Sequence, residues 1–311
     1  MRKAGRRREA AQGYLFLAPA LLIIGAFHVW PAVYVLYMSL FRWDILQGAF
    51  LGLRNYERLL QDADFLRSLL LTAVYVAGTV PLEMAAGLAL ALLLHQRLRF
   101  RGLFRLLYFL PYVTSQVAVA MVWGWVFNPT YGAANGLLES VGLPPQRWLL
   151  DPGGIFAPDT PPSLALATIM LVTVWYYLGF HAVVFLSGLG AIPEELLDAA
   201  RIDGASGLQL FRHITFPLLS PTTYFLLLVA SIGAMTSFNL VYVMGGGGQA
   251  FGCAGNPLGT TQVGALFVFD RFWCQTQLGY ASAAAFVLGL VVLAVSAANG
   301  RFFSRRVVYA G

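Results

Sequence analysis

The chain has 311 residues, of which 59% are hydrophobic and only 11% are charged, and its mean hydropathy is +0.70. A water-soluble domain of this length would have to expose large apolar patches, so the composition places the protein in a lipid bilayer. The net charge of +6 is better explained by membrane topology than by binding to nucleic acid. The only lysine is Lys3, which excludes a P-loop ATPase with a GxxxxGK[ST] motif.

Six segments are apolar and long enough to cross a membrane, since a spanning helix needs about 20 apolar residues. Pro31, Pro81 and Pro111 lie inside spans, which indicates kinks that either surround a pathway or, as we favour, serve packing. The predicted spans are Tyr14 to Phe41, Leu69 to Leu94, Leu106 to Phe127, Leu164 to Ala191, Pro217 to Met244 and Tyr280 to Phe303. We therefore predict an all-α integral membrane protein with six transmembrane helices.

The positive charges predict the orientation of these spans. Of the 20 lysines and arginines, 14 lie before the first span, between the second and third, between the fourth and fifth, or at the end of the last span and beyond it. Because positive residues are retained on the cytoplasmic side, we expect both termini to face the cytoplasm. The basic tail (1–13) has no signal-peptide cleavage site, so the six-span domain (14–303) keeps its first span, and a second cytoplasmic tail (304–311) follows.

A polar insert at residues 192–217 is predicted to form two short cytoplasmic helices joined by a glycine turn. The first helix would run from Pro193, a favoured first residue, to Asp203. Ser206 and Gln209 have the spacing of a capping box at the start of the second helix. That helix would end at Pro217, because a helix interior does not tolerate the proline ring.

The first of these helices has an apolar face and a charged face. Leu196, Leu197 and Ala200 lie on one side, as expected for a helix that packs against a neighbour. Its charged side chains would be available for contacts elsewhere, and they are Glu195, Asp198 and Arg201.

The insert also resembles the EAA motif of the membrane-spanning subunits of ATP-driven (ABC) importers. The matching residues are Asp198, Ala199, Ala200, Gly204, Ile214 and Pro217. Asp198 stands where the motif usually has glutamate, which keeps the charge but shortens its reach. The resemblance implies that the insert docks onto an ATPase subunit, and an ordinary cytoplasmic helical hairpin is the alternative.

The resemblance extends from Phe16 to Phe303 and narrows to sugar permeases of the maltose and glycerol-phosphate type. It is carried by GLRNYERLL with Asp62 and Phe65, RFRGLFRLLYFLPYV, WGWVFNPTYGAANGLL, the stretch from Trp148 to Pro152, and GYASAAAF. It implies the transmembrane fold of a type I ABC importer, working with a second permease, two ATPase subunits and an external binding protein. ATP and Mg²⁺ would bind to the ATPase subunits, and this chain would bind no cofactor.

Candidate substrate residues lie in the second and fifth spans. Sugars are held by aromatic faces and hydrogen-bonding groups, and polar groups deep in a membrane usually face a cavity or another helix. In the fifth span the candidates are Thr236, Ser237, Phe238 and Asn239. Glu83, near the middle of the second span, could serve either the pathway or a contact between helices.

Both cysteines, Cys253 and Cys274, lie in the loop from Gly245 to Leu278, which is predicted to face outward. A disulfide there would stabilise the fold by about 3 kcal/mol, and two unrelated thiols are the alternative. The histidines are His28, His95, His181 and His213. No pair of them has ligand spacing, so we expect no metal site.

Two other functions compete with the importer. A secondary transporter driven by protons or sodium could use Glu83 as its carrier, but no inverted repeat is visible and the insert would be unexplained. A membrane enzyme would need paired acid–base groups, and Glu83 with His28 and His181 is too small a set.

Overall fold

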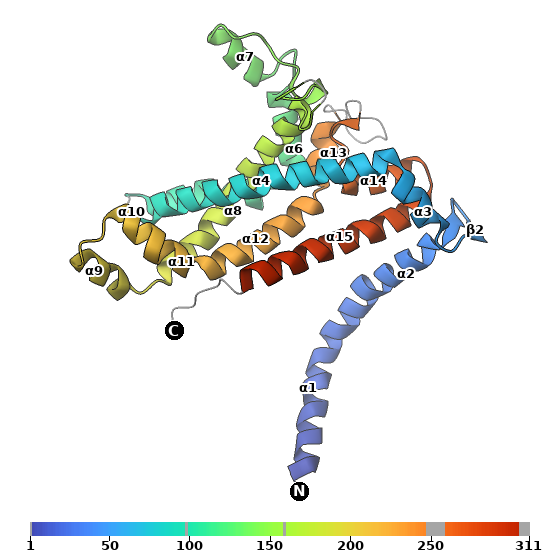
Figure 1. Cartoon of the computed structure of the whole chain (residues 1–311), viewed down its shortest axis with the longest axis horizontal. Helices are drawn as coiled ribbons and strands as arrows, with labels where there is room; N and C mark the ends of the chain where they lie inside the picture. Colours follow the sequence, from blue (N-terminus) through green and yellow to red (C-terminus); the bar gives the residue numbers. More distant parts are fainter. Residues whose placement is uncertain (1, 97–98, 158–159, 247–258, 305–311) are drawn as a thin grey trace. The chain divides into compact units, whose positions relative to one another are not determined.

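The computed structural model describes residues 2–96, 99–157, 160–246 and 259–304 (Figure 1). Helices dominate this part of the chain, as predicted. The chain divides into two compact units. Unit 1 comprises Met1–Asp62 and Val268–Gly289, and unit 2 comprises Ala63–Phe267 and Leu290–Gly311.

Unit 1 joins the first predicted span to a small hairpin and to the start of the last span. Its N-terminal elements are α1 (Arg2–Ile24), η1 (Gly25–Val29), α2 (Trp30–Ser39), β1 (Phe41–Trp43), β2 (Gln47–Phe50) and α3 (Arg54–Gln61). The later ones are η5 (Asp270–Cys274) and the beginning of α15 (Leu278–Ser304). The two strands pair antiparallel.

Side-chain hydrogen bonds fix the hairpin and α3 in unit 1. The amide of Asn55 donates to the carbonyl oxygens of Ser39 and Phe41 at 2.8 and 3.0 Å. Gly279, at the start of α15, lies so close to the carbonyl of Phe41 that a Cβ would collide with it. A glycine is therefore required where α15 meets β1.

Unit 2 is a helical bundle with short helices at its two ends. Its elements are α4 (Ala63–His95), α5 (Arg101–Val113), α6 (Gln116–Val126), α7 (Ala133–Ser140), η2 (Trp148–Leu150), α8 (Leu164–Gly190), α9 (Glu194–Ile202), α10 (Gly207–Leu210), η3 (Phe211–Thr215), α11 (Phe216–Leu218), α12 (Ser220–Met235), α13 (Asn239–Gly245), α14 (Gly264–Phe269, ending in unit 1) and the rest of α15. In Figure 1, α9 and α10 lie at the end of this unit opposite α7.

Glycines allow the long helices of unit 2 to approach closely. A Cβ at Gly87 of α4 would collide with the Cβ of His181 on α8, and one at Gly179 of α8 would collide with the carbonyl of Tyr108 on α5. Small residues at such crossings are typical of membrane helix packing. A buried apolar cluster from α4, α8 and α12 fills one end of the bundle, and it includes Leu94, Phe185, Leu189, Leu219 and Leu226.

Four predicted spans are confirmed as continuous candidate spans, two of them with an internal proline (Pro31, Pro81). They are Gly13–Ser39, Ala63–His95, Leu164–Gly190 and Leu278–Phe302. Two further helix pairs pass the same test when each pair is taken together, although each is bent at a short break. Counting each bent pair as one span gives six, in agreement with the predicted fold class.

The segment Leu106 to Phe127, predicted as one span with a kink at Pro111, is broken into two helices after Val113. The chain bends by 96° between α5 and α6, where Thr114 and Ser115 take extended backbone angles. The hydroxyl of Thr114 donates to the carbonyl of Leu110 at 2.9 Å. The same carbonyl also accepts the backbone N–H of Thr114 at 3.2 Å, so the hydroxyl adds a second bond at the end of the helix.

The predicted span Pro217 to Met244 is likewise broken, because α12 ends at Met235 and α13 begins at Asn239. The same device recurs at this break: the hydroxyl of Thr236 donates to the carbonyl of Ile232 at 2.8 Å. In both places a threonine is followed by a serine, Ser115 or Ser237. A Thr-Ser pair inside an apolar span is a sequence signal that could have located both breaks.

The segment from Gly245 to Leu278, predicted to be a loop, is partly helical. Its described residues include α14, in which Gly264, Leu266 and Phe267 are buried, and η5. The short apolar run of α14 was missed because six residues are too few for a periodic pattern to stand out.

Candidate functional site

The predicted docking insert contains a first helix, α9 (Glu194–Ile202). Pro193 precedes this helix as its N-cap, with ψ at 130°, and is not its first residue as predicted. The proline ring restricts φ alone, so ψ is free to take the extended value that lets the chain turn into the helix. Glu194 and Glu195 occupy the first turn, where negative charge suits the helix dipole.

Gly204 ends α9 in the left-handed conformation, with φ at +82°. The N–H of Ala205 donates to the carbonyl of Ala200 at 3.0 Å, and the N–H of Gly204 donates to that of Arg201 at 3.1 Å. These two bonds form a Schellman motif, which satisfies carbonyls at the helix end and favours glycine at this position. The glycine of the EAA-like motif therefore has a defined backbone role.

The capping box of the second helix is confirmed, with Ser206 and Gln209 exchanging side-chain bonds to backbone N–H groups. The helix does not end at Pro217, however, because it continues through Leu218 before a 64° bend. The π turn η3 widens the helix just before Pro217, which relieves the clash of the ring with the preceding turn. A second proline, Pro221, follows the bend and lies in the first turn of α12.

The docking insert presents a mixed surface. Asp198 and Arg201, expected to be available for contacts, form an exposed ion pair with each other at 2.7 Å. Ile202 and Leu208 are 87% and 77% exposed, and Leu196, assigned to a packing face, is also exposed. On the same insert Ile192 and Leu197 pack against the buried cluster of α4, α8 and α12. The insert is thus anchored on one side and open on the other.

The remaining motif residues lie along this insert. Ala199 is exposed on α9, whereas Ile214 in η3 and Pro217 in α11 are half-buried. The structure therefore places five of the six motif residues on α9, η3 and α11, and the sixth, Gly204, in the turn after α9.

The break between α12 and α13 is held to α4 and α6 by polar contacts. The hydroxyl of Tyr75 lies 3.2 Å from Ser237 Oγ and 2.7 Å from Thr173 Oγ1. The amide of Asn239 donates to Gln116 Oε1 at 3.0 Å. Sequence analysis missed Gln116 and Tyr75, because nothing in their local sequence distinguishes them from other polar residues in spans.

The other candidates at this break have local contacts. Thr236 bonds within α12, as described above, and the ring of Phe238 stacks on that of Tyr242 with centroids 5.1 Å apart. Thr236 and Asn239 are exposed, whereas Ser237 and Phe238 are half-buried. Four adjacent residues therefore face several different environments.

Glu83 is not part of this group. Its carboxylate lies 3.9 Å from His181 Nε2, and the two side chains are only 3% and 1% exposed. The pair lies at the close crossing of α4 and α8 that Gly87 permits. Of the two interpretations of Glu83, this geometry favours the contact between helices.

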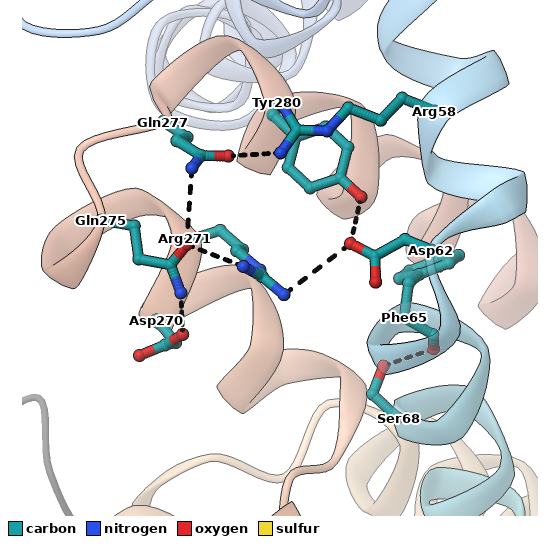
Figure 2. Close-up of polar contacts among 9 residues, drawn as sticks. All are labelled: Arg58, Asp62, Phe65, Ser68, Asp270, Arg271, Gln275, Gln277 and Tyr280. Carbon is teal, nitrogen blue, oxygen red and sulfur yellow. Dashed lines mark hydrogen bonds and ion pairs between the residues drawn. The ribbon is translucent and has the colours of Figure 1, made fainter.

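A polar cluster in unit 1 unites two separate landmarks of the sequence (Figure 2). Tyr280 donates to Asp62 Oδ2 at 2.6 Å, and Arg271 lies 3.7 Å from the same oxygen. Arg58 stacks over the ring of Tyr280, 4.3 Å from its centroid, and donates to Gln277 at 3.3 Å. Cys274 of η5 lies nearby in sequence, but Cys253 lies outside the described residues, so the predicted disulfide stays a prediction.

The chain is similar to known membrane transport proteins. Residues 83–308 match the family model described as "Binding-protein-dependent transport system inner membrane component". The trehalose/maltose transport system permease protein MalF of Thermococcus litoralis is 35% identical over 301 residues, covering 95% of each chain. The sn-glycerol-3-phosphate transport system permease protein UgpA of Agrobacterium fabrum is 31% identical over 299 residues, covering 95% of this chain and 96% of the relative.

Solved structures share the fold. A chain of a bacterial ABC transporter involved in the import of the acidic polysaccharide alginate superimposes with a TM-score of 0.81 at 20% identity, over 98% of this chain and 99% of that one. A second structure of the alginate transporter, in complex with an alginate pentasaccharide-bound periplasmic protein, has the same TM-score at 19% identity.

Proposed function

The chain belongs to the family of inner membrane components of binding-protein-dependent transport systems, and on this premise we propose that it imports a sugar or a related small solute. It is a multi-pass permease subunit of an ABC importer and not an enzyme. The substrate class is supported by its relatives, which are named for trehalose and maltose or for sn-glycerol 3-phosphate.

The observation that carries the coupling mechanism is the docking insert. It exposes Ile202 on α9 and Leu208 on α10, while Ile192 and Leu197 pack into the bundle. Exposed apolar residues of this size mark a protein contact when they gather on one element. An ATPase subunit that bound the exposed residues would move the bundle, because Ile192 and Leu197 of the same insert pack into it.

ATP and Mg²⁺ would bind to these ATPase subunits, because the single lysine of this chain, Lys3, rules out a P-loop. A difference in affinity for two conformations is what allows ATP to drive the change. We propose that closure of two ATPase subunits opens the pathway outward to a loaded binding protein, and that hydrolysis resets it. A second permease would complete the pathway.

The proposed location is the cytoplasmic membrane of a bacterial-type cell, with both termini and the docking insert inside. The distribution of lysine and arginine supports this orientation. The binding protein would then act on the opposite side of the membrane.

The ion-driven transporter has little support. The family is one of binding-protein-dependent systems, and Glu83, its only carrier candidate, is buried beside His181. The two mechanisms are separated by reconstituting the complete importer in sealed vesicles with ATP or with an imposed ion gradient. Uptake that needs ATP and ignores the gradient supports the proposal, and uptake driven by the gradient alone would refute it.

A further inference from the structure

Gln116 links the two broken spans of unit 2. It is the first residue of α6, directly after the bend at Thr114 and Ser115. Its Nε2 donates to the hydroxyl of Tyr177 on α8 at 3.0 Å, and its Oε1 accepts from Nδ2 of Asn239 on α13 at 3.0 Å. Both ends of the Gln116 side-chain amide are therefore hydrogen-bonded, which fixes the orientation of the Tyr177 and Asn239 side chains.

These bonds leave specific groups free on the neighbours of Gln116. Asn239 is exposed, and with Nδ2 turned toward Gln116 its Oδ1 accepts no hydrogen bond among the described residues. Tyr177 accepts from Gln116 and keeps its own O–H hydrogen to donate. An acceptor and a donor thus flank the same amide. A sugar hydroxyl, which both donates and accepts, can bond to both kinds of group.

The helices that surround Gln116, Tyr177 and Asn239 carry none of the four charged residue types. The helices α6, α8, α12 and α13 contain no lysine, arginine, aspartate or glutamate. His181 is their only histidine, and it is buried against Glu83 of α4. A cation stabilises an anion in a water-poor pathway, and these helices contribute no lysine or arginine. Gln116, Tyr177 and Asn239 therefore suit a neutral solute better than a phosphorylated one.

We propose that Gln116 is a positioning residue for substrate specificity. It holds the amide of Asn239 so that Asn239 and Tyr177 contact hydroxyl groups of a neutral sugar or polyol. This inference rests on the proposed import function and adds to it both a substrate class, neutral as opposed to phosphorylated, and a residue that distinguishes between hydroxyl arrangements.

The test uses the complete importer with its own binding protein in vesicles. Uptake is measured for labelled maltose, trehalose and sorbitol, and for sn-glycerol 3-phosphate and glucose 6-phosphate as anionic probes. The variants are Gln116→Leu, Asn239→Leu and the double variant. Gln61→Leu, a matched change of an exposed glutamine on α3, serves as the control.

For the best neutral probe, Gln116→Leu should raise the half-saturating concentration about tenfold, the effect of losing one hydrogen bond of ordinary strength. The maximal rate and the amount of assembled complex should stay near wild type, which a purely structural role would not allow. Because Gln116 acts through Asn239, the double variant should be no weaker than Asn239→Leu alone. The size of the loss should differ among the neutral probes.

Three results would overturn the inference while the import function stands. They are an unchanged half-saturating concentration in Gln116→Leu, losses that multiply in the double variant, and uptake of the phosphorylated probes as efficient as that of the neutral ones. A wild-type complex that took up none of the probes with ATP would instead refute the proposed function, and the inference with it.

Discussion

Tyr280 donates a hydrogen bond of 2.6 Å to Asp62, across 218 residues of sequence. The same tyrosine carries the guanidinium of Arg58 over its ring. Each partner belongs to a segment that sequence analysis identified separately, GLRNYERLL with Asp62 and GYASAAAF. The structure shows that these landmarks form a single polar cluster, which joins α3 to the start of α15 (Figure 2).

Removing this hydroxyl should destabilise unit 1. Tyr280→Phe keeps the ring under Arg58 but deletes the bond to Asp62, and a hydrogen bond to a charged group contributes about 1.5 to 3 kcal/mol. We expect a lower thermal unfolding temperature for the purified complex in detergent. Tyr131→Phe is the control, since Tyr131 is 72% exposed. Equal unfolding temperatures for the two variants would show that the bond contributes little.

Substitutions at Gly204 should impair coupling in a graded way. No atom lies within 4 Å of an added Cβ, so the penalty comes from φ at +82° and not from a clash. Asparagine tolerates this conformation best, alanine costs about 1 to 2 kcal/mol, and a β-branched valine is worst. Transport and copurification with the ATPase should fall in the order Asn, Ala, Val.

The matched control for that series is Gly207→Ala, where a Cβ also meets nothing and φ is not positive. It should leave transport unchanged. Wild-type transport and normal copurification in Gly204→Val would count against the docking role of the turn.

Two exposed apolar residues of the docking insert should matter for assembly. Ile202→Ser and Leu208→Ser remove apolar surface that the folded chain does not bury, so the yield of folded permease should be kept. Losing the burial of one such side chain should weaken ATPase binding by about 1.5 to 3 kcal/mol. Pull-down of the ATPase measures this, and undiminished capture would argue that another surface binds it.

Because Gly87 is tightly packed, even the methyl group of an alanine at this position should destabilise the complex. In Gly87→Ala the new methyl group meets the Cβ of His181, and overpacking of this kind costs about 1 to 3 kcal/mol. Gly124→Ala on α6, where a Cβ meets nothing, is the control. Detergent-resistant complex should decrease for the first variant only, and similar yields would show that α4 and α8 can separate without cost.

The cysteine pair can be tested chemically. If Cys253 and Cys274 are bridged, a digest under non-reducing conditions should contain the two linked peptides. Labelling of either thiol from outside should then require prior reduction. Free thiols that react without reduction would leave the loop without its predicted disulfide.

The sequence by itself was enough for features that depend on neighbouring residues. The membrane class and four continuous spans follow from long apolar runs. The capping box of Ser206 and Gln209 and the left-handed turn at Gly204 follow from local backbone chemistry. The EAA-like motif indicated the family for the same reason, since its residues lie within one short insert. Residues close in sequence stay close in any fold, so their pattern is informative.

The tertiary structure alone decided what depends on distant residues. Gln116 and Asn239 are 123 positions apart, and they meet only because both spans break and bring these breaks together. The pairing of Glu83 with His181 likewise depends on α4 crossing α8 at a glycine. Many helix arrangements bury the same apolar surface equally well. Which polar groups meet inside the bundle is therefore settled by packing between helices, which no local pattern encodes.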